Sequence, residues 1–198
     1  VHASKNIDYL TIHIWPKNWN WFKAETMEVD FPQVVSKTID YISRHSAVAE
    51  KLNKPLVIEE FGFPRDGHVY DTASTTLLRN KYYDLIFNFW NNGVRPGVNF
   101  WAFNGTARPI KGQPFWKKGN DYMGDPPMEE QGLNGVYDSD AETWYTITSH
   151  SLKPNESAQM PKEVELLCSP IDCNATKETV NLAKNLKALL AKGIMFGH

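Results

Sequence analysis

The nine residues 54–62, Lys-Pro-Leu-Val-Ile-Glu-Glu-Phe-Gly, constrain the fold of this chain more than any other segment. A short aliphatic run bounded by a proline and a glycine is typical of a fully buried strand in a parallel sheet. Glu59 and Glu60 follow this run at the carboxyl end of the predicted strand. Carboxylates are seldom buried without a partner, and α/β enzymes carry catalytic groups at this end of their strands. The alternative is that Glu59 and Glu60 begin a solvated loop.

A second strand is predicted over residues 7–15, which are rich in β-branched and aromatic side chains and stop at Pro16. Side chains alternate along a strand, so His13 and Trp15 share one face at its carboxyl end. The same alternation predicts that Glu59 points to the face opposite Glu60, towards helices or a neighbouring loop.

Helices are predicted between the strands, over residues 30–52 with Asp30 as a candidate cap and over residues 74–90. Their inner faces are expected at Val35, Ile39 and Ile42 in the first helix and at Leu78, Tyr82, Leu85 and Phe89 in the second. A third strand over residues 98–103 and a short helix over residues 140–150, with Trp144 and Ile147 inside, continue the pattern.

The order strand, helix, strand, helix, strand requires parallel strands, so the predicted fold class is α/β. A closed (β/α)8 TIM barrel needs eight strands and typically about 250 residues. We therefore expect a partial barrel, with its amino-terminal strands missing. The long Gly-, Pro- and Asp-rich segment 104–140 is predicted to contact a ligand, and Asn104 and Arg108 are its candidate contacts or else ordinary loop anchors.

Composition narrows the class of partner. The chain has 198 residues, 41% of them hydrophobic, and a net charge of −2, which favours one sizeable core and neither a nucleic-acid nor a membrane partner. No His/Glu pair has metal-site spacing and no Gly-rich phosphate loop occurs, so we expect no metal and no cofactor. Aromatic residues make up 13% of the chain, and such rings suit the faces of sugars.

The composition predicts three regions: a main domain over residues 1–152, a linker over 153–162 with two prolines, and the start of a second domain over 163–198. The last region contains an amphipathic pattern over residues 176–192. It also holds Cys168 and Cys173, which form either a local disulfide or two free thiols.

The motif of residues 54–62, together with Thr-Ile-His-Ile-Trp-Pro before it and Asn-Phe-Trp-Ala-Phe-Asn-Gly after it, resembles strands six to eight of family 5 glycoside hydrolases. The likeness is greatest to the endo-β-1,4-mannanase branch. It implies that Glu60 is the nucleophile, that His13 helps to orient it, and that Trp101 lies under the sugar at the cleavage point. Many members have a Tyr that bonds the nucleophile where this chain has Trp15, which leaves an indole N–H for that contact.

The resemblance implies retaining hydrolysis of β-mannan or manno-oligosaccharides by an extracellular or periplasmic enzyme. The acid/base of the family follows an Asn on strand four, which has no counterpart here, so we expect this chain to be inactive alone. Glu129 and Glu130 are expected to be solvated or to contact a distal sugar. The alternatives are a β-1,4-glucanase of the same family and a non-catalytic carbohydrate-binding module. Residues 163–198 resemble the opening helix and strand of family 26 glycoside hydrolases.

Limited proteolysis tests the predicted linker. A polar segment with two prolines exposes its backbone, so the first cuts are expected between Lys153 and Pro161. Mass spectrometry of the early fragments locates them. Early cleavage within residues 57–60 would show that the glutamate strand does not form.

Overall fold

The computed structural model describes residues 2–92 and 96–151. It contains a parallel three-stranded sheet in the order β1 (Leu10–Ile14), β2 (Leu56–Phe61) and β3 (Pro96–Phe100). Helix α1 (Met27–Lys51) follows β1, and α2 (Leu77–Asn92) follows β2. The predicted strand and helix order is confirmed. The predicted linker, the second domain and both cysteines lie outside the described residues.

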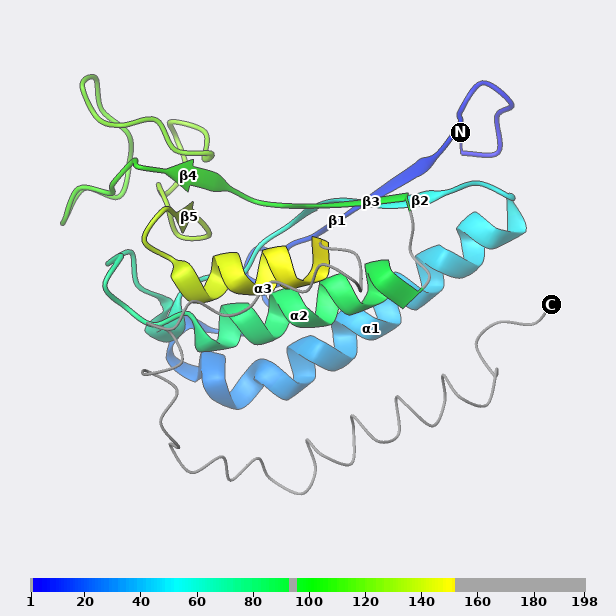
Figure 1. Ribbon diagram of the computed structural model, residues 1–198, viewed down its shortest axis with the longest axis horizontal. Helices are drawn as coiled ribbons and strands as arrows, with labels where there is room; N and C mark the ends of the chain where they lie inside the picture. Colours follow the sequence, from blue (N-terminus) through cyan, green and yellow to red (C-terminus); the bar gives the residue numbers. More distant parts are fainter. Residues whose placement is uncertain (1, 93–95, 152–198) are drawn as a thin grey trace. The chain divides into compact units, whose positions relative to one another are not determined.

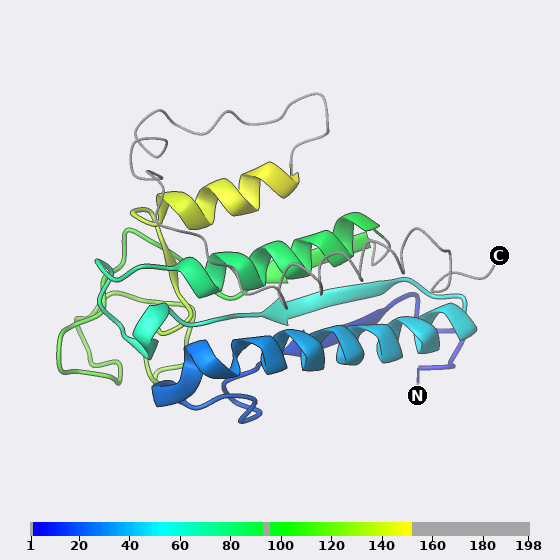
Figure 2. The ribbon, with the colours of Figure 1, turned by 90° about the horizontal axis from the view of Figure 1, so that it is seen from below.

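The three helices, including α3 (Ala141–Ser151), lie on one side of the sheet (Figures 1 and 2). The burial of β1 alternates accordingly: Leu10, Ile12 and Ile14 are buried, whereas Thr11 and His13 are exposed on the other face. No helix within the described ranges combines the length and apolarity that crossing a membrane requires.

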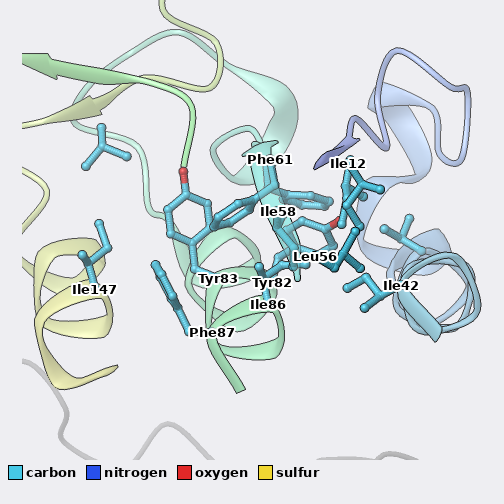
Figure 3. Packing of buried hydrophobic residues seen from close by; sticks show 14 of the residues in the cluster. Ile12, Ile42, Leu56, Ile58, Phe61, Tyr82, Tyr83, Ile86, Phe87 and Ile147 are labelled. Carbon is cyan, nitrogen blue, oxygen red and sulfur yellow. The ribbon is translucent and has the colours of Figure 1, made fainter. Parts of the chain in front are cut away.

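The core lies between the sheet and the helices (Figure 3), where Ile58 and Phe61 of β2 pack with aromatic residues of α2. Ile42, Tyr82 and Ile147 are buried as predicted, and Trp144 packs against the core. Leu78, Leu85 and Phe89 are partly buried and pack against the core, as predicted. Val35 and Ile39 are only partly buried, and Val34 and Thr38 are the buried residues of α1 instead. Helix α2 also buries Tyr83, Ile86 and Phe87.

Polar contacts explain why Thr38 is buried and why α2 begins later than the sequence predicted. Thr38 is tolerated in the core because its hydroxyl lies 3.1 Å from that of Tyr82. Helix α2 begins at Leu77 rather than Ser74 because the carboxylate of Asp66 accepts hydrogen bonds from the backbone N–H groups of Leu77 (2.8 Å) and Leu78 (2.9 Å). This cap comes from a separate 3-10 helix (Asp66–His68), and no local helix-start motif reveals it.

Helix α1 also begins earlier than predicted, after a 3-10 turn (Ala24–Thr26). Asp30 therefore lies within its first turn, where its carboxylate accepts a hydrogen bond of 2.5 Å from the Thr26 hydroxyl. The predicted third strand is divided between β3 and β4 (Phe103–Gly105), and β4 pairs in parallel with β5 (Val136–Tyr137). The segment 104–140 is thus partly structured, and residues 131–137 are buried.

A buried ionic cluster joins the end of β2 to α2 and α3. Asp140 contacts the guanidinium groups of Arg65 and Arg79, and all three side chains are at most 3% exposed. Arg79 also donates to three backbone carbonyls, those of Phe63 (2.8 Å), Gly135 (2.8 Å) and Leu133 (3.1 Å). The cluster therefore holds segments that are distant in the sequence around one buried carboxylate.

Removal of this carboxylate is expected to destabilise the fold strongly. Asp140→Ala leaves two buried guanidinium groups without their counter-charge, which costs about 3 to 5 kcal/mol. The matched control is Asp40→Ala, because Asp40 pairs with Arg44 on the exposed surface of α1. Urea denaturation followed by circular dichroism is expected to show a large loss for Asp140→Ala and an almost unchanged midpoint for the control. Similar midpoints for the two variants would contradict this role.

Candidate active site

The pairing of β1 with β2 brings His13 to Glu60. Leu10 lies opposite Leu56 and Ile12 opposite Ile58, but the register then shifts so that His13 lies opposite Glu60. His13 Nδ1 is 3.1 Å from Glu60 Oε2, and the Glu60 side chain is 28% exposed. The carboxylate at the end of β2 is thus partly accessible and oriented by an imidazole.

Glu59 contacts the same imidazole, with Oε2 3.2 Å from His13 Nε2. The prediction that Glu59 points away from the site is therefore wrong, because the shift in register interrupts strict alternation. Hydrogen bonds with Thr11 and His13 lower the pKa of the Glu59 carboxyl. His13 therefore lies between two carboxylates.

Glu60 lines a cleft of about 520 Å³. Trp15 and Trp101 form part of its wall, with their rings edge to face at 6.2 Å and 81°. The indole N–H of Trp101 donates to Asp125 Oδ1 at 3.3 Å. No hydrogen bond joins Trp15 to Glu60 in the described structure, so the contact expected from the family's Tyr is replaced by this aromatic packing.

Gly62 allows the Trp15 ring and the Trp101 backbone to approach the end of β2. A Cβ atom at Gly62 would lie 2.7 Å from the Trp15 ring and 3.0 Å from the Trp101 carbonyl oxygen. Both distances are too short for a Cβ atom, so Trp15 or the Trp101 backbone would have to move. The glycine after Phe61 is therefore required by the packing of the cleft wall.

Asn104 and Arg108 do not line this cleft. Asn104 is buried, and its Oδ1 accepts a hydrogen bond of 3.1 Å from the backbone N–H of Gly124. Arg108 pairs with Asp138, donates to the carbonyls of Gly105 and Ala107, and borders a separate cavity of about 670 Å³. These are the contacts of loop anchors, the alternative that the sequence left open.

The cleft also contains residues that the sequence did not single out as site residues. Its wall includes Lys17, Asn18, Phe115, Asp125 and Asn134. They come from loops far apart in the sequence, and no shared motif connects them. Glu129 and Glu130 also line the cleft, and Glu130 Oε2 forms an ion pair of 2.9 Å with Lys17 Nζ.

The arrangement suits attack by a carboxylate on a sugar. Glu60 is partly accessible and contacts the His13 imidazole, while Trp15 and Trp101 supply apolar surface beside it. Within residues 2–92 and 96–151, no group of three or more His, Cys, Asp or Glu side chains is arranged to hold a metal ion.

Comparisons with known proteins point to one family. The model of the GH (glycoside hydrolase) family 5 beta-mannosidase-like family matches residues 1–157. Mannan endo-1,4-beta-mannosidase 2 of Arabidopsis thaliana is 25% identical over 162 residues, which are 79% of this chain and 34% of that protein. Mannan endo-1,4-beta-mannosidase 5 of the same plant is 31% identical over 85 residues, 43% of this chain and 18% of that protein.

Solved structures show the same relationship. The family 5 mannosidase from Rhizomucor miehei superposes with a TM-score of 0.64 at 31% identity, over 74% of this chain and 38% of that chain. A mutant of that enzyme in complex with mannosyl-fructose gives a TM-score of 0.66 at 31% identity, over 76% and 38%. The chain thus spans between 18% and 38% of the length of these relatives.

Substitution of Gly62 tests the packing of the cleft wall. Gly62→Ala forces Trp15 to move, and the overpacking is expected to lower the free energy of unfolding by about 1 to 3 kcal/mol. The control is Gly97→Ala, whose added Cβ would meet only Val57 Cγ1 at 3.7 Å. Chemical denaturation measures the stability, and tryptophan fluorescence reports the indole environment. An equal effect of both substitutions would contradict the described packing.

Proposed function

The chain belongs to the GH family 5 beta-mannosidase-like family, and on that basis we propose that the complete protein hydrolyses β-1,4-mannosidic linkages in mannan-type polysaccharides. The names of the Arabidopsis relatives and the mannosyl-fructose complex of the Rhizomucor enzyme support a mannosyl substrate. The parallel sheet argues against a carbohydrate-binding module, because such modules are mostly antiparallel sandwiches.

The position of Glu60 carries this proposal. Its carboxylate lies at the carboxyl end of β2, contacts His13 and faces a cleft with two indoles. In a retaining reaction Glu60 attacks the anomeric carbon, and a glycosyl-enzyme ester forms as the glycosidic C–O bond breaks. The leaving oxygen takes a proton from a general acid. Water, deprotonated by the conjugate base of that acid, then attacks the ester, which releases the sugar and Glu60.

The general acid is proposed to lie outside the described residues. Retaining glycosidases hold their two carboxyl groups about 5 to 5.5 Å apart. Three other carboxylates line the cleft. Asp125 accepts hydrogen bonds from Trp101 and from the Gly132 backbone, Glu130 is paired with Lys17, and Glu129 is an exposed side chain of the loop between β4 and β5. The family's acid on strand four has no counterpart in residues 1–152, so we expect the 198-residue chain to be inactive alone.

The fold supports the proposal of a partial barrel. Helices cover one face of the sheet, and the other face carries His13 and the two glutamates. In a complete barrel this face would be the interior, and strands β1, β2 and β3 would take the places of strands six to eight.

We also propose a linker at residues 153–162, a family 26 domain that begins at residue 163, and an extracellular or periplasmic location.

Kinetics of the complete protein test the function. Glu60→Gln retains the shape of the side chain but cannot form the ester, so kcat on mannan should fall by about a thousandfold or more with little change in KM. Glu59→Gln removes only one partner of His13 and should lower kcat less. Glu28→Gln, on the exposed surface of α1, is the matched control and should retain full activity.

Parallel assays on mannan and cellulose distinguish the proposed substrate from the glucanase alternative. The wild-type protein is expected to release reducing sugar from mannan much faster than from cellulose. Faster hydrolysis of cellulose would contradict the substrate assignment. Undiminished activity of Glu60→Gln would contradict the assignment of the nucleophile.

A further inference from the structure

The pair formed by Lys17 and Glu130 has no role in the reaction described above. Lys17 follows β1, whereas Glu130 lies in the segment between β4 and β5. Both side chains line the same cleft as Glu60, and they are 34% and 42% exposed. A charged pair that links two loops is thus accessible to whatever occupies the cleft.

Several contacts fix the position of this pair. The backbone at Glu130 forms an antiparallel bridge with Phe115, and the N–H of Gln131 donates to the Pro114 carbonyl at 2.7 Å. The Glu130 carboxylate also accepts a hydrogen bond from Tyr70, which lies between β2 and α2. Three separate loops therefore hold the carboxylate before any ligand binds, which reduces the entropy lost on binding.

The pair offers both kinds of hydrogen-bonding group. The Lys17 ammonium has three N–H donors, of which Glu130 takes one. The hydrogen bond from Lys17 lowers the pKa of the Glu130 carboxyl, which keeps it an ionised acceptor. Neighbouring hydroxyl groups of a sugar both donate and accept, so they match a carboxylate beside an ammonium group. Phe115, which is half exposed and lines the cleft, supplies an apolar surface next to them.

We propose that Lys17 and Glu130 bind the hydroxyl groups of a second sugar unit of the substrate, next to the unit that Glu60 attacks. This inference rests on the proposed function. It makes the pair a determinant of substrate length: a substrate with one sugar unit gains nothing from Lys17 and Glu130, and an oligosaccharide that reaches them does. The alternative is that the ion pair only joins the two loops. Its loss would then affect the hydrolysis of all substrates alike.

The test uses the complete protein with two substrates, 2,4-dinitrophenyl β-mannoside and mannotetraose. Lys17→Met and Glu130→Gln are each expected to lower kcat/KM on mannotetraose by about 10- to 100-fold, the range for losing a charged hydrogen bond. The change on the aryl mannoside should stay within about threefold, since that substrate has a single sugar unit. Arg44→Gln, on the exposed surface of α1, is the control and should change neither value.

Binding gives an independent readout. In the Glu60→Gln background, titration calorimetry with mannotetraose should show a similar loss of affinity when Lys17→Met is added. Equal losses on both substrates, or no loss on mannotetraose, would overturn the second sugar site. A wild-type protein that cleaves neither substrate and binds no mannotetraose would instead overturn the proposed function itself.

Discussion

The register between β1 and β2 determines which side chains meet at the open face of the sheet. Leu10 and Ile12 of β1 are buried against the helices, as are Leu56 and Ile58 of β2, so a slip by one residue would expose these apolar side chains. The shift after Ile12 then aligns the polar ends of both strands and places His13 between two glutamates. The geometry of the candidate site thus depends on burial on the opposite face.

The ionic cluster around Asp140 extends this constraint to the wall of the cleft. Arg79 holds the carbonyl of Phe63, one residue after Gly62, and the carbonyl of Leu133, which lines the cleft. Two arginines share the carboxylate in a dry environment, and breaking such a buried arrangement costs far more than losing an exposed ion pair. The wall and the end of β2 are therefore positioned by the same buried charges, which links stability to the shape of the cleft.

The sequence predicted the parts of this structure that depend on local pattern. The parallel strands, both long helices and the nearness of His13 to Glu60 follow from periodicity and from the family motifs. It did not predict contacts made between distant segments, such as the pair of Lys17 and Glu130, which are 113 residues apart. The face of Glu59 was also missed, because alternation describes regular strands and the register here is irregular.

Trapping the covalent intermediate tests the central claim, that Glu60 is the nucleophile, most directly. A 2-fluoro-mannoside with a good leaving group forms the glycosyl-enzyme but hydrolyses it slowly, so the complete protein should accumulate one labelled residue. Peptide mass spectrometry is expected to place the label on Glu60. A label on Glu59, or no label on a protein that the reagent inactivates, would contradict the assignment of Glu60 as the nucleophile.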